Sequence, residues 1–388
     1  MTTSVQSVST GLSAEGTTPL RVYVDCVGWF VRPQNTDWRY SIFQIPRLPE
    51  YAKGIETHAQ QSWAISFKEN ERYIRRKIAQ LILGNRKPDP LRYQGELDRA
   101  ELQRSGCDVV FSHRRFPINA APIPVVWQNA LLDPEMRLAN GATEEELKQD
   151  LEAIAPMMEK ASLVQLATSS EARRHVQMFP EFASKFVAVS FFLPGTQSLS
   201  AEAVREKQEA AGKIEIVFVG NDARRKGLDR LLAAYMQLPQ SLRGRTKLSI
   251  VTNFNDGQIP IPSDASIRMS QPLPRAEVMR LFSSAHIFAM PSRFECFGLV
   301  FVEAMANGMV PIVPNWEVQR EIVDSGTAGC TTTGEPADLA QLLAALIEDS
   351  SMRTNLALAA HQRYEKEFSP DVVAERSHSI FLKARLPS

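Results

Sequence analysis

PSRFECFGLVFVEAMANG, residues 291–308, joins the end of an apolar run to a helical pattern and places Glu295 and Glu303 on either side of a Phe-Gly pair. The preceding run, IFAMPS, predicts a buried strand, and residues 299–307 predict a helix that Gly308 ends. Strand, loop and helix in this order form the repeating unit of a doubly wound parallel sheet. The stretch therefore predicts an α/β fold.

Short apolar runs continue this pattern along the chain. The C-terminal half holds IEIVFVG, KLSIVTN, SIRMS and VPIVP, and the N-terminal half holds RVYVDCVG, DVVFSH, PVVWQN, LVQLAT and FVAVSFF. Such runs are typical of strands covered on both faces of a parallel sheet. A chain of 388 residues has room for two domains of this kind. We expect two Rossmann-like, doubly wound domains that face each other across a ligand-binding cleft.

The composition along the chain predicts where these domains begin and end. Residues 1–18 are rich in Ser, Thr and Gly and predict a disordered leader. Residues 19–195 then form the N-terminal domain, the polar residues 196–213 a linker, and residues 214–368 the C-terminal domain. We expect residues 369–388 to form a helix that packs back on the N-terminal domain.

The bulk composition excludes several classes of protein. Lys plus Arg and Asp plus Glu number 44 each, so no net charge draws the chain toward nucleic acid. The four cysteines form no C-x-x-C pair, which argues against a zinc ribbon or a disulfide scaffold and predicts reduced, mostly buried thiols. No apolar run approaches the ~18 residues that span a bilayer. We expect a cytoplasmic protein.

The two glutamates of the opening stretch flank a predicted helix start. The backbone N–H groups of Phe297, Gly298 and Leu299 stand there, where unpaired donors and the helix dipole stabilise an anion. Ionised carboxylates only accept hydrogen bonds, so Glu295 and Glu303 suit the hydroxyl groups of a sugar. The alternative is structural: Glu295 is a solvated loop residue and Glu303 belongs to an ion pair.

A basic loop follows the run IEIVFVG in the sequence VGNDARRKGLDRLL. Arg224, Arg225 and Lys226 lie there at the predicted carboxyl edge of the sheet, where phosphates are usually bound. The alternative is a solvated surface triplet. The chain contains neither the P-loop pattern nor a G-x-G-x-x-G after a strand, which argues against a P-loop nucleotidase and a nicotinamide or flavin enzyme.

In this order and spacing the two motifs resemble the C-terminal domain of GT-B glycosyltransferases, especially glycosyltransferase family 4, over residues 214–367. The resemblance implies that Glu295 contacts the donor sugar and that Glu303 hydrogen-bonds the nucleotide ribose. It also implies that Arg225 and Lys226 hold the donor diphosphate, with Arg224 as a possible substitute.

The resemblance implies further contacts in the same domain. The backbone around Phe297, Gly298 and Leu299 would touch donor oxygens, and the nucleobase would lie near residues 269–272, beginning with Met269. No D-x-D pair occurs in the chain, in keeping with the metal-independent chemistry of this fold class, and we expect no cofactor. Gln319 stands where relatives often have a glycine.

The N-terminal half resembles these enzymes only diffusely. Gly28 is a candidate for close backbone approach to the diphosphate, with an ordinary turn as the alternative. Relatives often carry a histidine after an N-domain strand, near the sugar. Here that role is open among His113, Gln128 and Asn129, of which only the histidine titrates near neutral pH.

The function implied is transfer of a hexose from a UDP- or GDP-sugar, with retention of configuration, to a hydroxyl acceptor of glycan or lipid-linked type, as in polysaccharide biosynthesis. One alternative is a non-catalytic GT-B scaffold that binds a nucleotide. Another is a GT-B-like sugar-nucleotide epimerase, which would release nucleotide without an acceptor.

Residues 67–87, FKENERYIRRKIAQLILGNRK, predict a basic amphipathic helix. Its cationic residues are Arg72, Arg75, Arg76 and Lys77. The ordinary interpretation is a helix that packs on the sheet with solvated charges. The alternative is peripheral contact with an anionic membrane, where each cation contributes about 1 kcal/mol.

Overall fold

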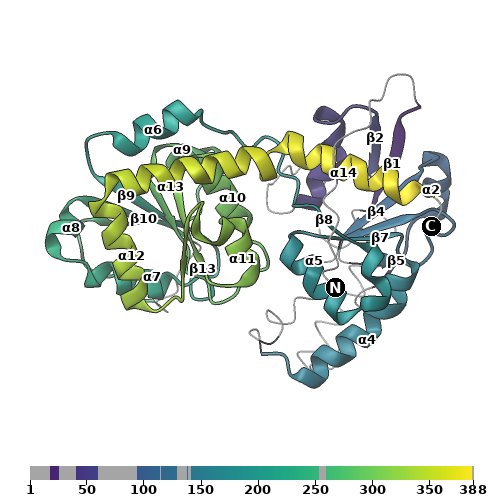
Figure 1. Ribbon diagram of the computed structural model, residues 1–388, viewed down its shortest axis with the longest axis horizontal. Coiled ribbons are helices and arrows are strands. Elements are labelled where there is room, and N and C mark those ends of the chain that lie inside the picture. Colours follow the sequence, from purple (N-terminus) through teal and green to yellow (C-terminus); the bar gives the residue numbers. More distant parts are fainter. Residues whose placement is uncertain are drawn as a thin grey trace. The chain divides into compact units, whose positions relative to one another are not determined.

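The computed structural model describes residues 18–25, 41–59, 94–113, 115–128, 138, 141–252 and 259–386. The chain divides into two compact units (Figure 1): unit 1 contains Met1–Pro194 and Pro370–Ser388, and unit 2 contains Gly195–Ser369. Gly28, Asn129, the basic segment 67–87 and all but the last residue of the expected leader lie outside the described residues.

Unit 1 is built on a six-stranded parallel sheet in the order β2-β1-β4-β6-β7-β8. Its strands are β1 (Leu20–Asp25), β2 (Ile55–Ala59), β4 (Val109–His113), β6 (Val125–Gln128), β7 (Leu163–Leu166) and β8 (Phe186–Ala188). Apart from β2, they are largely buried, as near-continuous apolar runs predict.

The other described elements of unit 1 are η1 (Ser41–Glu50), α2 (Arg99–Ser105), α4 (Glu144–Lys160), α5 (Ser169–Met178), η3 (Pro180–Lys185), α14 (Pro370–Arg385) and a small pair of strands, β3 (Gln94–Gly95) and β5 (Phe116–Pro117). A capping box begins α4, in which Thr143 and Glu146 each bond the other's backbone N–H. These bonds satisfy two of the donors that a helix start leaves unpaired.

Helix α14 joins the end of the chain to the core of unit 1. The buried side chains of Val373, Ala374 and Ile380 belong to the same apolar cluster as the strands β1 and β4. The ring of Phe381 meets that of Phe111 edge to face, with centroids 5.7 Å apart. Helix α14 therefore contributes to the same hydrophobic core as β1, near the other end of the chain.

Unit 2 is built on a second six-stranded parallel sheet, in the order β11-β10-β9-β12-β13-β14. The strands are β9 (Ile214–Val219), β10 (Thr246–Val251), β11 (Ile267–Ser270), β12 (Ile287–Ala289), β13 (Val310–Pro314) and β14 (Cys330–Thr332). Numbered within the unit, this order is 3-2-1-4-5-6, the doubly wound arrangement. Its direction reverses between β9 and β12, where such sheets bind ligands.

The helical elements of unit 2 are α6 (Ala201–Glu209), α7 (Leu228–Gln237), α8 (Gln240–Gly244), α9 (Arg275–Ser284), α10 (Leu299–Ala306), α11 (Glu317–Ile322), η4 (Asp324–Gly326), α12 (Pro336–Glu348), α13 (Ser350–Arg363) and the π-helical turn η5 (Tyr364–Phe368). None of the described helices of the chain is both long and apolar enough to cross a membrane.

Helix α6 occupies half of the segment 196–213, which we expected to be a linker. Ser200 caps its first turn, and the side chains of Val204 and Gln208 are buried. Helix α6 packs on α13, and this segment is part of unit 2. Its polar composition reflects the exposed face of a helix that buries few residues.

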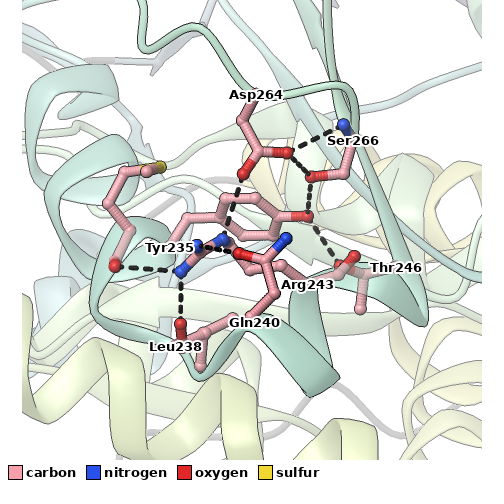
Figure 2. A network of polar contacts seen from close by, with 8 residues as sticks. Tyr235, Leu238, Gln240, Arg243, Thr246, Asp264 and Ser266 are labelled. Carbon is pink, nitrogen blue, oxygen red and sulfur yellow. Dashed lines mark hydrogen bonds and ion pairs between the residues drawn. The ribbon is translucent and has the colours of Figure 1, made fainter.

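A polar network holds the amino-terminal edge of the unit 2 sheet (Figure 2). The hydroxyl of buried Tyr235 on α7 bonds Thr246 at 2.6 Å and Ser266 at 2.8 Å. Asp264 accepts hydrogen bonds from Ser266 and, at 3.0 Å, from Arg243 Nε, and the bonds from Ser266 above all hold its pKa below the ordinary value. The network fixes α7 and α8 to the starts of β10 and β11, at the edge opposite the strands' carboxyl ends.

Candidate functional site

The loop between β9 and α7, residues 220–227, carries the predicted basic triplet and is called the basic loop below. It lies against the loop between β12 and α10, residues 290–298, called the Glu295 loop. Gly227 has φ +80°, and a Cβ atom there would lie 2.1 Å from the carbonyl oxygen of Pro291. Only glycine allows this approach. The backbones of the two loops therefore lie directly against each other at the switch point.

Two cations of the basic loop converge on Glu295. Lys226 Nζ donates to Glu295 Oε2, and Arg225 Nη1 lies 3.7 Å from the same oxygen. The guanidinium of Arg225 also lies over the ring of Phe294, 5.2 Å from its centroid, and donates to the Phe294 carbonyl at 3.3 Å. Residues 69 positions apart in the sequence thus form one charged group.

Arg225 is oriented by a residue that the sequence did not single out. Asp222 has φ +62° and accepts hydrogen bonds from Arg225 Nε at 2.9 Å and Arg225 N at 3.3 Å. Aspartate tolerates this left-handed backbone better than most residues. Arg224, by contrast, is exposed.

A second ion pair fastens the same two loops. Arg293 donates to both carboxylate oxygens of Asp229, at 2.8 and 2.7 Å, and its backbone N–H donates to the carbonyl of Arg225 at 2.8 Å. Burial, the largest single effect, would raise the pKa of Asp229, but the hydrogen bonds and charge of Arg293 and the backbone N–H groups of Asp229 and Arg230 together hold the pKa below its usual value. The pair keeps Arg225 beside Glu295.

Helix α10 begins at Leu299 as predicted, and its N-cap residue, Gly298, provides no side-chain cap. Gly298 has φ +90°, and a Cβ atom there would lie 2.5 Å from the ring of Phe301. Phe297 is buried, and its ring packs on Phe368 with centroids 6.3 Å apart. No side chain at the N-cap therefore accepts a hydrogen bond from the first N–H groups of α10, which begin at Leu299.

Glu303 lies inside α10 and is buried, with 4% of its side chain exposed. Its Oε1 accepts a hydrogen bond of 2.5 Å from Arg275 Nη1, at the start of α9. Burial raises the pKa of Glu303, and the charge of Arg275 opposes that rise. No described residue donates to Oε2, so one carboxylate oxygen is held while the other has no protein donor.

The remaining predicted residue of unit 2, Met269, lies on the edge strand β11 and is 38% exposed. The chain leads from this strand directly to Arg275, the partner of Glu303. Arg275 was not predicted from the sequence, because its charge stands in an ordinary amphipathic helix pattern.

In unit 1 the two described candidates meet each other. His113 ends β4 and Gln128 ends β6, opposite each other in register, and His113 Nδ1 lies 2.9 Å from Gln128 Oε1. On the neighbouring pair β1 and β4, Ser112 donates to Asp25 at 2.6 Å. The carboxyl ends of β1, β4 and β6 thus carry a row of polar side chains. The sequence predicted two of them, His113 and Gln128, but not Asp25 and Ser112.

The cysteines differ from the prediction of mostly buried thiols at one place. Cys107 is half-buried and Cys330 is buried, but Cys296, between Glu295 and Phe297, is exposed. The turn to α10 points this side chain outward. Within the described ranges, no group of three His, Cys, Asp or Glu side chains could hold a metal ion.

Residues 200–363 match the family model described as Glycosyl transferases group 1. A D-inositol 3-phosphate glycosyltransferase of Corynebacterium kroppenstedtii is 31% identical over 178 residues, which are 42% of this chain and 40% of that protein. A glycogen synthase of Mycobacterium tuberculosis is 28% identical over 188 residues, 46% of this chain and 45% of that protein. The chain spans less than half the length of these two relatives.

Solved structures share the fold over almost the whole chain. HepE of Anabaena, in complex with UDP and glucose, has a TM-score of 0.61 at 15% identity, over 94% of this chain and 100% of that one. WaaG, described as a glycosyltransferase involved in lipopolysaccharide biosynthesis, has a TM-score of 0.57 at 15% identity, over 93% and 99%. The chain therefore has the architecture of GT-B proteins, two Rossmann-like units, and the predicted fold class is confirmed.

Proposed function

We propose that the protein transfers a hexose from a UDP- or GDP-sugar to a hydroxyl acceptor, with retention of configuration. The observation that carries the proposal is the contact of Lys226 and Arg225 with Glu295 at the switch point of the unit 2 sheet. Cations suited to a diphosphate and a carboxylate suited to sugar hydroxyls occur there side by side. The match to glycosyltransferases over residues 200–363 supports the same reaction class.

The charges suggest how a donor would bind. Lys226 and Arg225 are paired with Glu295 in this structure. A diphosphate would compete for the two cations, and the N–H groups at the start of α10 would add donors. The Glu295 carboxylate, released from part of its pairing, would then accept hydrogen bonds from the sugar. The same cations would stabilise the charge that develops on the leaving diphosphate without a metal ion.

Glu303 is proposed to bind the nucleotide ribose. Its Oε1 is held by Arg275, which leaves Oε2 as the acceptor for a ribose hydroxyl. The nucleobase would lie toward β11 and Met269. Use of UDP is supported by HepE of Anabaena, whose solved structure contains UDP and glucose.

Replacement of Arg225 and Lys226 together by Ala tests the metal-free mechanism. We expect the double variant to lose more activity than either single variant, because both cations stabilise the same developing charge. Activity of the native protein should survive EDTA. A strict requirement for Mg²⁺ or Mn²⁺ in the chemical step would contradict the mechanism.

The acceptor is proposed to be a hydroxyl of a glycan or of a lipid-linked precursor. If it is lipid-linked, the basic segment that contains Arg72, Arg75, Arg76 and Lys77 would contact an anionic membrane. Co-sedimentation with anionic vesicles should then be lost at high salt and in a variant with these four residues changed to Gln. Equal binding of the variant would favour a soluble acceptor.

A thermal-shift screen of UDP- and GDP-hexoses tests the proposed function directly, because a ligand of the native state raises its apparent stability. We expect at least one nucleotide sugar to raise the melting temperature, and its nucleotide to be released faster when acceptor is added. Release without any acceptor would instead identify an epimerase, and binding without turnover a scaffold.

A further inference from the structure

Gln319 holds the Glu295 loop from the side opposite the basic loop. It lies on α11, which follows β13, and its side chain is completely buried. Its Nε2 donates to the carbonyl oxygen of Glu295 at 3.1 Å and to that of Phe297 at 3.0 Å. These two carbonyls bracket the turn that leads into α10, so one amide group fixes both ends of the turn.

The orientation of this amide is determined by its partners. Both are carbonyl oxygens, which only accept, so the NH2 group must face them. Both amide hydrogens are then used, and Oε1 is left buried without a partner in the described part of the chain. An unpaired buried acceptor disfavours the folded state. An apolar side chain would avoid that cost but would leave the carbonyls of Glu295 and Phe297 without this donor, so the amide is retained for its hold on the loop backbone.

Helix α11 is itself anchored to the rest of unit 2. Arg363 donates to the carbonyl oxygens of Ile322 and Glu321, at 2.7 and 2.5 Å. The Arg363 guanidinium also lies over the ring of Phe368, 5.7 Å from its centroid. Phe368 packs on Phe297 of the Glu295 loop. The same group of side chains therefore contacts both α11, which carries Gln319, and the loop that Gln319 binds.

We propose that Gln319 is a positioning residue for donor transfer, which fixes the Glu295 carboxylate and the first N–H groups of α10 in their working geometry. The inference rests on the proposed function, since it assigns these groups to the donor. Gln319 acts on the donor only through the loop backbone, from the helix that follows β13, and β13 is the strand next to β12 in the sheet.

Gln208 provides a matched control. It is also a buried glutamine of unit 2, and its Nε2 also donates to two carbonyl oxygens, those of His286 at 3.1 Å and Gly308 at 2.9 Å. These carbonyls precede β12 and β13, at the edge of the sheet away from the proposed site. Its Oε1 accepts from Arg353 Nε at 3.1 Å, so no atom of this amide is unpaired.

The experiment compares Gln319→Met with Gln208→Met in the full chain, since methionine keeps the shape and removes the amide. In Gln319→Met, we expect hydrogen exchange of peptides covering residues 293–299 to accelerate and kcat to fall about ten- to hundredfold, with donor KM changed much less. In Gln208→Met we expect a lower melting temperature than in Gln319→Met, with native exchange in that loop and native kcat.

Native kcat and native loop exchange in Gln319→Met would overturn the positioning role. If that variant does not fold, Gln319→Asn, whose amide is one methylene shorter, must show the faster exchange and lower kcat, and native values would overturn the proposal. If the native protein turns over no nucleotide sugar, the proposed function fails, while loop exchange still reports whether Gln319 holds the loop.

Discussion

The two glutamates of the proposed donor site have different surroundings, and these predict different roles. Glu295 is partly exposed and shares Oε2 with two cationic side chains of the basic loop, whereas Glu303 is buried and held by Arg275. A carboxylate that can change its ion-pair partners, as Glu295 can, is able to respond to charge that develops during the reaction. A group that is fixed in the core is better suited to bind a part of the substrate that does not react.

Glu295→Gln should therefore lower kcat with little change in donor KM, and Glu303→Gln should raise the donor KM. Loss of a hydrogen bond to a charged group costs about 1.5–3 kcal/mol, or roughly ten- to hundredfold. Steady-state kinetics with the nucleotide sugar found by the screen measure both values. Glu277→Gln, on the exposed face of α9, is the control, and unchanged kinetics in both site variants would contradict the assignment.

Cys296 offers a chemical probe of the same loop. It is exposed, whereas burial raises the pKa of Cys107 and raises that of Cys330 to about 11. Alkylation requires the thiolate, so in a Cys26→Ser background iodoacetamide should modify Cys296 first. Bound nucleotide sugar should slow that modification, which mass spectrometry measures, and equal rates with and without the ligand would place the donor elsewhere.

At the residue scale, the sequence predicted groups whose type and position at a strand end already suggest chemistry. Glu295, Lys226 and Arg225 are of this kind, and the structure brings them together. Arg275 could not be predicted, because its contact with Glu303 spans 28 residues and follows no helical or strand period. The direction of the Gln319 amide depends on two carbonyls, which leave no signal in the sequence.

At the scale of elements, the starts of the unit 2 strands contain a titratable group whose charge the fold disfavours. His286 precedes β12, and its Nδ1 accepts a hydrogen bond of 3.2 Å from the N–H of Glu215. Burial, with the nearby charges of Lys207 and Arg353, lowers the pKa of His286 to about 4. The native state therefore keeps this imidazole neutral where the unfolded chain protonates it.

The consequence is a loss of stability in mild acid. Between pH 6.5 and 4 the unfolded state binds a proton that the native state does not, so the free energy of unfolding falls as the pH is lowered, by about 3 kcal/mol at most. His286→Asn keeps an acceptor and cannot titrate, so it should flatten this dependence. Urea unfolding at pH 7 and pH 5 measures it, and an equal fall in the variant would assign the effect to other groups.

The sequence predicted elements well where burial is complete and less well where it is partial. IEIVFVG and VPIVP are β9 and β13, covered on both faces. The strand β2, IETHA, was not predicted because only its first residue is buried. Likewise α6 was expected to be a linker, since its few buried residues give a weak periodic pattern among many charges.

At the scale of the whole molecule, the chain begins and ends in the same unit. Residues 18–25 supply β1, and α14 supplies side chains to the apolar cluster around β1 and β4, although more than 300 residues separate them. Unit 2 is continuous in sequence, from Gly195 to Ser369. The stability of unit 1 must therefore depend on a helix that follows unit 2 along the chain.

Phe381→Ala tests this dependence. The side chain is fully buried against Phe111, and its truncation should cost about 3–5 kcal/mol. In calorimetry we expect the variant to lower the transition of unit 1, while the nucleotide sugar raises that of unit 2 by mass action. Leu343→Ala, buried in α12, is the reciprocal change and should lower the nucleotide-sensitive transition. Because the described apolar partners of Phe381 belong to unit 1, a shift of the nucleotide-sensitive transition by Phe381→Ala would contradict the assignment of α14 to unit 1.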